Sequence, residues 1–281
     1  PLVVQRSMIW RRQSGAMGSR RIGATALLIA ATVACSPEDL SGERDFDDVA
    51  VVGLAPGPDD NRESIVQVYA ARSYEPLPRL VSVHTWIAYR QAGEEKYTIY
   101  EAHRFQPRLS GRAVRTCQKY YPDRKWHGAE PTLLFEIRGE AADRAIEGIE
   151  DAVETYDDVY RLWPGPNSNT LVAELARSVD ELKVDLPPTA IGKDFLPGWR
   201  VLAPVPSGTG WQVSFLGMLG LLVALEEGIE LNLFGAVFGL DLNPPALKLP
   251  IVGRLGFAQG RRPDPSDAER LRHIPPETRC H

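Results

Sequence analysis

The segment from Trp163 to Thr170, WPGPNSNT, concentrates residue types that can build a reactive turn. Its two prolines fix the backbone, and Gly165 permits a sharp or left-handed turn. Four side chains then suit a helix N-cap, because their oxygens accept hydrogen bonds from free backbone N–H groups: Asn167, Ser168, Asn169 and Thr170. A helix start also stabilises negative charge. The segment therefore predicts small polar groups at a helix N-terminus, either as a functional site or only as a cap.

Strand-like runs rich in β-branched and aromatic residues precede this segment. They cover Ser64 to Arg72, Leu80 to Arg90, Lys96 to Arg104 and Pro131 to Arg138. In the second run, alternation places His84 and Trp86 on the face opposite to the core-facing residues. These core-facing residues are Val81, Val83, Thr85, Ile87 and Tyr89. His84 is therefore expected to point toward whatever packs across the other face.

Helical periodicity predicts two helices. Apolar residues recur at helical spacing from Ala142 to Tyr156, with acids between them, and a shorter helix is expected from Ser168 to Val179. Together the elements predict an α+β fold in which an antiparallel sheet packs with helices. A single domain is expected over residues 64–257, after a polar tether at 36–63 and before a polar tail at 258–281.

The region from Trp211 to Leu240 is unusually apolar. Residues 211–225 carry no charge, Glu226-Glu227-Gly228 follows, and residues 229–240 are again mostly apolar. The continuous run is too short for a membrane-spanning helix. We interpret the region as a buried C-terminal β-hairpin that turns at EEG. The alternative is an apolar surface that faces a membrane or a partner.

Residues 1–35 have the composition of a targeting segment. The apolar run from Ile22 to Ala34 is too short to span a bilayer comfortably, and Cys35 follows it directly. This arrangement resembles a bacterial lipoprotein signal, in which the cysteine is lipidated and becomes the new N-terminus. We expect export to the periplasmic side of the cell envelope, with membrane contact through Cys35. Simple secretion, an N-terminal anchor and a cytosolic location are the alternatives.

Charge and cysteine content narrow the class of protein. The net charge is −5, and residues 1–35 contribute five arginines and no acid, so the rest of the chain is more acidic. No basic stripe remains to neutralise phosphates, which argues against a nucleic-acid partner. The absence of CxxC and HExxH spacing argues against a metal site, and no cofactor is expected. Cys117 and Cys280 can pair in an oxidising compartment, but the sequence does not establish that they do.

Several long motifs resemble one protein family. They are VVGLAPGP, IVQVYAAR, VHTWIAY, YTIYEAHRF, WPGPNSNT, LPPTAIGKDF, EEGIELNLFGAVFG and ALKLPIVGRLG. From Ser64 to Phe257 the chain is similar to the uncharacterised bacterial family catalogued as domain of unknown function 3750. The family has no established activity, so the resemblance implies no function.

A more distant similarity suggests a mechanism. Circularly permuted papain-like proteins of the NlpC type carry a histidine on an early strand, a polar partner on the next strand and a nucleophilic cysteine at a later helix start. The same order here implies a permuted papain-like core, with His84 as general base, Glu101 or His103 orienting it, and Ser168 as nucleophile. A serine hydroxyl is far less acidic than a thiol, so Ser168 would need His84 as a true base.

Three hypotheses follow from these residues. The first is a hydrolase or acyltransferase acting on amide or ester bonds, with helix-start N–H groups stabilising the oxyanion. The second is a non-catalytic cleft that binds an envelope peptide, a lipid or a small molecule, and the third is a structural protein. Ligand contacts are expected from Trp86, Trp163, Asn167, Asn169, Thr170 and Lys193. Cys117 is the alternative nucleophile, and the oligomeric state is left open.

Overall fold

The computed structural model describes residues 51–73, 81–104, 111–156, 159–257 and 260–263. The predicted targeting segment with Cys35, the first part of the tether, and most of the tail lie outside these residues. Within the described ranges, no helix combines the length and the apolar character needed to cross a membrane.

The first sheet has five antiparallel strands in the order β4-β3-β2-β1-β5. The strands are β1 (Ile65–Arg72), β2 (Val83–Arg90), β3 (Tyr97–Ala102), β4 (Val114–Lys119) and β5 (Thr132–Arg138). Four of them coincide with predicted strands. The edge strand β4 was not predicted, because its sequence VRTCQK is too polar to show an apolar alternation.

Helices α2 (Glu140–Glu154) and α3 (Ser168–Ser178) pack on one face of this sheet and bury Val83, Ile87 and Tyr89 of β2 with it. The opposite face holds Trp86 and Ala88 and is covered by residues 52–55 and the segment around Trp126. Both helices and the α+β class are thus as predicted. The end of the predicted tether differs, since Val52 and Leu54 are buried in this second core.

The second sheet is a meander of seven antiparallel strands, in which each strand pairs with the next along the chain. Its strands are β6 (Leu202–Pro204), β7 (Gly210–Phe215), β8 (Leu219–Ala224), β9 (Ile229–Leu233), β10 (Ala236–Leu242), β11 (Pro245–Leu249) and β12 (Gly253–Gly256). The predicted hairpin is therefore wrong in extent, because residues 211–240 contain four strands rather than two. The turn at EEG is confirmed between β8 and β9.

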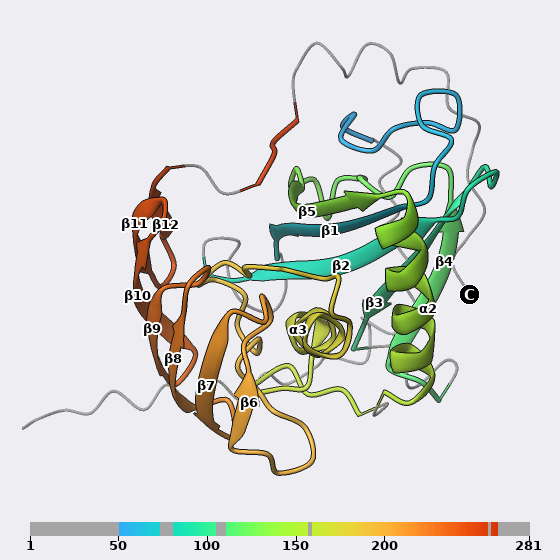
Figure 1. Ribbon diagram of the computed structural model, residues 1–281. Coiled ribbons are helices and arrows are strands. Elements are labelled where there is room, and N and C mark those ends of the chain that lie inside the picture. Colours follow the sequence, from blue (N-terminus) through green and yellow to red (C-terminus); the bar gives the residue numbers. More distant parts are fainter. Residues whose placement is uncertain (1–50, 74–80, 105–110, 157–158, 258–259, 264–281) are drawn as a thin grey trace, which may run out of the picture. The chain divides into compact units, whose positions relative to one another are not determined.

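Helix α3 lies between the two sheets (Figure 1). It packs against β2 on one side, and its Arg177 reaches the second sheet on the other. The Arg177 guanidinium donates to the Pro204 carbonyl at 3.1 Å and to Gln212 Oε1 at 3.0 Å. Residues 179–201, named the connecting loop from here on, lead from α3 to β6. Helix α3 therefore contacts β2 through its first turn and the second sheet through its last turn.

Candidate functional site

The N-terminus of α3 is built as a capping box. The side-chain oxygen of Asn167 accepts hydrogen bonds from the backbone N–H groups of Asn169 and Thr170, at 3.0 and 3.1 Å. In return, the Thr170 hydroxyl accepts from the Asn167 N–H at 3.1 Å. A helix start leaves the N–H groups of its first turn without backbone partners. Here the Asn167 side chain accepts from two of them, and the Thr170 side chain accepts from the N–H of Asn167 in return.

The same amides fasten the cap to the connecting loop and to β2. Asn167 Nδ2 and Asn169 Nδ2 both donate to the Ile191 carbonyl, at 3.0 and 2.8 Å. Asn169 Nδ2 also donates to the Val83 carbonyl at 3.0 Å. Gly192 must approach Asn167 closely, since a Cβ at that position would lie 2.4 Å from the Asn167 amide nitrogen. The predicted ligand contacts Asn167, Asn169 and Thr170 are therefore used within the fold.

The Ser168 backbone and the His84 side chain lie on opposite faces of the first sheet. The Thr85 hydroxyl is 3.2 Å from the Ser168 carbonyl and donates to the Asn169 side chain, so Thr85 is the residue that faces the helix start. His84 follows the alternation and points to the other face, where its ring stacks on Trp126 at 3.8 Å between centroids. The hydrogen bond expected between Ser168 and His84 is absent among the described residues.

The predicted pair of His84 and Glu101 is present. His84 Nε2 lies 3.0 Å from Glu101 Oε2, and both side chains are buried. The other carboxylate oxygen accepts from Arg115 Nε at 3.0 Å and from Arg124 Nη2 at 2.9 Å. Burial alone would raise the pKa of Glu101, but the two arginines outweigh it and hold the pKa well below its usual value. Glu101 is therefore an anion fixed by three partners.

His84 is held as a neutral imidazole. Burial lowers its pKa despite the raising effect of Glu101, and it lowers the pKa of neighbouring His103 to about 4. No described hydroxyl or thiol is hydrogen-bonded to His84. Trp86, a predicted ligand contact, is fully buried and donates from its indole to the Pro122 carbonyl at 3.0 Å. This face thus holds a packed charged cluster.

Cys117, the alternative nucleophile, is disulfide-bonded. The other cysteines of the chain, Cys35 and Cys280, lie outside the described residues. A sulfur in a disulfide bond is not a thiolate, so Cys117 cannot act as a nucleophile in this state.

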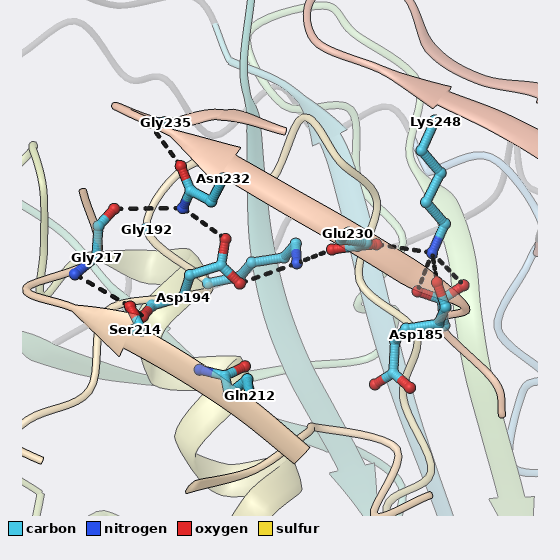
Figure 2. A network of polar contacts seen from close by, with 12 residues as sticks. Asp185, Gly192, Asp194, Gln212, Ser214, Gly217, Glu230, Asn232, Gly235 and Lys248 are labelled. Atoms are coloured by element: carbon cyan, nitrogen blue, oxygen red, sulfur yellow. Dashed lines mark hydrogen bonds and ion pairs between the residues drawn. The ribbon is translucent and has the colours of Figure 1, made fainter. Parts of the chain in front are cut away.

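A second set of charged residues lies between the connecting loop and the inner face of the second sheet (Figure 2). We name it the polar layer. Its members are Asp185, Lys193 and Asp194 from the loop, and Gln212, Ser214, Glu230, Asn232, Asp241 and Lys248 from the sheet. The predicted ligand contact Lys193 is one of them, and its ammonium binds Asp194 at 3.0 Å and Glu230 at 2.5 Å. Burial alone would lower the pKa of Lys193, but these two acids raise it, so the side chain stays charged.

Glu230 joins the two lysines of the polar layer. Its second oxygen accepts from Lys248 Nζ at 2.8 Å. Lys248 is also 3.1 Å from both Asp185 Oδ1 and Asp241 Oδ1, so three carboxylates share one ammonium. A cavity beside Glu230 and Gln212 has a volume of about 10 Å³. That is room for about one water molecule, so this cavity does not hold an organic substrate.

The polar layer also fixes two turns of the sheet. The Asn232 amide donates to Asp194 Oδ2 at 2.7 Å and to the Gly217 carbonyl at 3.3 Å. Its oxygen accepts from the Gly235 N–H at 2.8 Å, as Figure 2 shows. One side chain thus connects the β7–β8 turn, the β9–β10 turn and the connecting loop.

Asp185 should make stability depend on pH. Burial raises its pKa to about 7, because Lys248 is shared with other acids and offsets the burial only in part. The native state therefore holds a proton that the unfolded state, with a pKa of about 3.9, releases. This contribution to stability is complete below pH 4 and is lost as the pH rises to 7. Between pH 4 and pH 7, the free energy of unfolding of wild type should therefore fall by up to about 4 kcal/mol more than that of Asp185→Asn.

Urea unfolding between pH 4 and 8 measures this difference. Asp180→Asn, at an exposed position in the same loop, is the matched control and should keep the wild-type profile. Equal pH profiles for wild type and Asp185→Asn would contradict the assignment.

The outer face of the second sheet is apolar and exposed. Apolar side chains point outward along strands β7 to β11. The inward positions of β7, β9, β10 and β11 hold polar or charged side chains, beside the buried Leu222, Val237 and Ala246, which is largely the reverse of an ordinary half-buried sheet. We name the outward set the apolar face. It comprises Leu202, Trp211, Val213, Phe215, Leu219, Leu221, Val223, Ile229, Leu231, Leu233, Phe238, Leu240, Leu242, Leu247 and Leu255, each at least 41% exposed.

Strand register makes this face continuous. Trp211, Val223, Ile229, Leu240, Leu247 and Leu255 are paired in sequence from β7 to β12. The interpretation of the region as a buried hairpin is therefore wrong, and its apolar residues face outward. The signal was visible in the sequence, because polar residues alternate with apolar ones at Gln212 and Ser214 and again at Glu230 and Asn232.

The model of one protein family, described as Protein of unknown function (DUF3750), matches residues 63–195. The matched part contains the first sheet, α2, α3 and the connecting loop as far as Phe195. The motif VVGLAPGP at residues 51–58 and the motifs from Glu226 onward, which entered the resemblance, lie outside it. No curated protein and no solved structure matches the chain.

Proposed function

Residues 63–195 belong to the DUF3750 family of unknown function, and on that premise we propose that the chain is a non-catalytic binding protein of the cell envelope. Its working surface is the apolar face of the second sheet. The domain formed by the first sheet and the two helices is the base that holds this surface. The binding hypothesis is thus kept, but its site moves from a cleft at Ser168 to the outside of the second sheet.

The observation that carries this proposal is the charge-free composition of the apolar face. Monomeric soluble proteins rarely expose one continuous apolar patch of more than a few hundred Å², and larger patches mark interaction sites. Seven strands spaced about 4.8 Å apart, with strands of about 20 Å, give a face on the order of 600 Å². An exposed face of this size is unfavourable in water unless a partner covers it.

The separation of Ser168 from His84 supports a non-catalytic role. A serine nucleophile needs a base within about 3.2 Å. The Ser168 backbone contacts Thr85 on one face of the sheet, whereas the His84 ring stacks on Trp126 on the other, and no hydrogen bond joins the two residues among those described. We retain the permuted papain-like core as a proposal about the origin of the first sheet, supported by the order of the His84 strand, the Glu101 strand and the α3 start. In this proposal the old catalytic positions have become structural.

Export and lipidation of Cys35 are part of the proposal. The disulfide at Cys117 supports an oxidising compartment, because disulfides are rare where thiols are kept reduced. Labelled palmitate should enter wild type and be lost in Cys35→Ala. Equal incorporation in both would contradict the anchor.

The proposed function predicts that the apolar face binds apolar probes. Wild type should enhance the fluorescence of 1-anilinonaphthalene-8-sulfonate, and Leu221→Asp with Leu231→Asp should reduce the enhancement at least threefold. These two side chains are paired neighbours at the centre of the face, so two carboxylates there interrupt the patch. Ser178→Asp with Asp180→Asn, at exposed positions outside the face, is the control. A dye signal equal in all three proteins would contradict the proposed function.

A further inference from the structure

The two ends of the second sheet differ in chemistry. The turns at one end expose Glu226 between β8 and β9 and Asn243 between β10 and β11, beside the exposed Leu225 and Leu242. The turns at the other end are apolar, with Phe234 between β9 and β10 and with Ile251 and Val252 between β11 and β12. We name them the polar end and the apolar end. The two ends therefore differ in charge, because the turns of the apolar end contain no charged residue and the polar end carries Glu226.

Two tryptophans add to the apolar end. Trp199 is 84% exposed and precedes Val201, whose carbonyl accepts from the Ser214 N–H at 2.8 Å near the end of β7. The indole of Trp163 lies beside the β9–β10 turn, since a Cβ at Gly235 would be 3.3 Å from its Nε1. Trp163 is 48% exposed. Both indole rings add exposed apolar area at this end.

Several backbone groups of the apolar end have hydrogen-bond partners within the protein, and the Ile251 and Val252 carbonyls accept from the Arg72 guanidinium at 3.2 and 3.4 Å. A polar backbone group in hydrocarbon must have a hydrogen-bond partner within the protein. The Phe234 N–H donates to the Met218 carbonyl at 2.5 Å, and the Met218 N–H to the Phe215 carbonyl at 3.0 Å. The Val252 N–H donates to the Pro250 carbonyl at 2.7 Å, and Asn232 holds the Gly235 N–H.

The strand lengths correspond to one leaflet of a bilayer. Strands β7 to β11 have five to seven residues, which is about 17–23 Å at roughly 3.3 Å per residue. One leaflet contributes about 15 Å of hydrocarbon, and a strand that spans both needs about 9–11 residues. The face can therefore enter one leaflet but is too short to span the bilayer.

Building on the proposed function, we propose that the partner of the apolar face is the acyl-chain region of a single membrane leaflet. The apolar end enters first, and the polar end with Glu226 stays at the aqueous surface. A second copy of the chain would also cover the face. It would not require apolar turns beyond the ends of the strands, which is why the lipid is the better match.

The test is co-flotation of the full chain, in a Cys35→Ala background, with phosphatidylethanolamine–phosphatidylglycerol vesicles. Phe234→Asp with Leu231→Asp should lower the ratio of bound to free protein at least tenfold. Phe234 has a φ of 54°, which aspartate tolerates better than most residues, so the fold should remain. The matched control is Leu225→Asp, which places one carboxylate at the polar end on a side chain that is 80% exposed. It should change binding less than twofold.

Depth is measured with lipids brominated on their acyl chains. They should quench wild-type tryptophan fluorescence, and Trp199→Phe should remove much of the quenching. All variants keep the same residues 1–50, so any difference between them comes from the sheet. Equal flotation of all variants would overturn the inference. Dimerisation that Leu231→Asp abolishes, with unchanged flotation, would also overturn it but would leave the proposed function standing. If the dye signal of wild type also equalled that of the Leu221→Asp, Leu231→Asp variant, both the inference and the proposed function would be rejected.

Discussion

Glu230→Ala is expected to lower the free energy of unfolding by about 3–5 kcal/mol. The Glu230 carboxylate is the counter-ion shared by Lys193 and Lys248, and all three side chains are buried. Removing it leaves two ammonium groups with reduced compensation in a medium where an unpaired charge is costly. The second sheet and the connecting loop meet at this carboxylate, so its removal weakens the association of the sheet with the loop. Urea denaturation followed by circular dichroism measures the change.

The control for this prediction is Glu226→Ala, four residues earlier in an exposed turn. It should change the free energy of unfolding by no more than about 0.5 kcal/mol. Glu230→Gln should fall between the two, since the amide keeps the shape but not the charge. A loss below 1 kcal/mol for Glu230→Ala would show that the polar layer does not hold the second sheet in place.

Glu101→Ala should destabilise the first sheet by a similar amount, about 3–5 kcal/mol. The carboxylate is fully buried, and its loss leaves Arg115 and Arg124 facing each other with no anion between them. His84 loses its hydrogen-bond partner as well. If the cluster is structural, as proposed, Ser168→Ala should leave stability within about 1 kcal/mol. A fluorophosphonate probe should label neither wild type nor this variant.

Glu130→Ala is the matched control, because its ion pair with Lys125 is at the surface and has a median value of only about 0–1 kcal/mol. Covalent labelling by the probe that disappears in both Ser168→Ala and His84→Ala would contradict the structural role. In that case the helix start and the strand histidine would have to come together in a conformation other than this one.

Local patterns were sufficient to predict most of the first sheet. The periodicity of residues 142–156 is strong enough to identify α2, and the caps around Asn167 predict where α3 begins. Alternation along β2 correctly separated His84 from Thr85. It could not say which face α3 would cover, because α3 is more than 80 residues away in the sequence and only tertiary packing brings it to Thr85.

The second sheet was interpreted incorrectly for a different physical reason. Apolar runs are ordinarily assigned to the core because burial stabilises them. Here the inward positions hold Glu230, Asn232 and Lys248, whose partners Lys193, Asp194 and Asp185 come from the connecting loop. Those partnerships join residues far apart in the sequence, so no local pattern contained them. The sequence did not predict that Arg115 and Arg124 bind Glu101 for the same reason, because no local pattern contained these contacts.

The reversed second sheet also has a consequence for the thermal behaviour of the protein. The heat capacity of unfolding rises with the apolar area that becomes exposed and falls with the polar area. The side chains of the apolar face are already hydrated in the native state in water, whereas the polar layer becomes hydrated only on unfolding. Both effects reduce the heat-capacity change of this sheet below the usual value of about 12–15 cal/mol/K per residue. In water its stability curve is therefore flatter than that of the first sheet, and covering the apolar face restores the ordinary curvature.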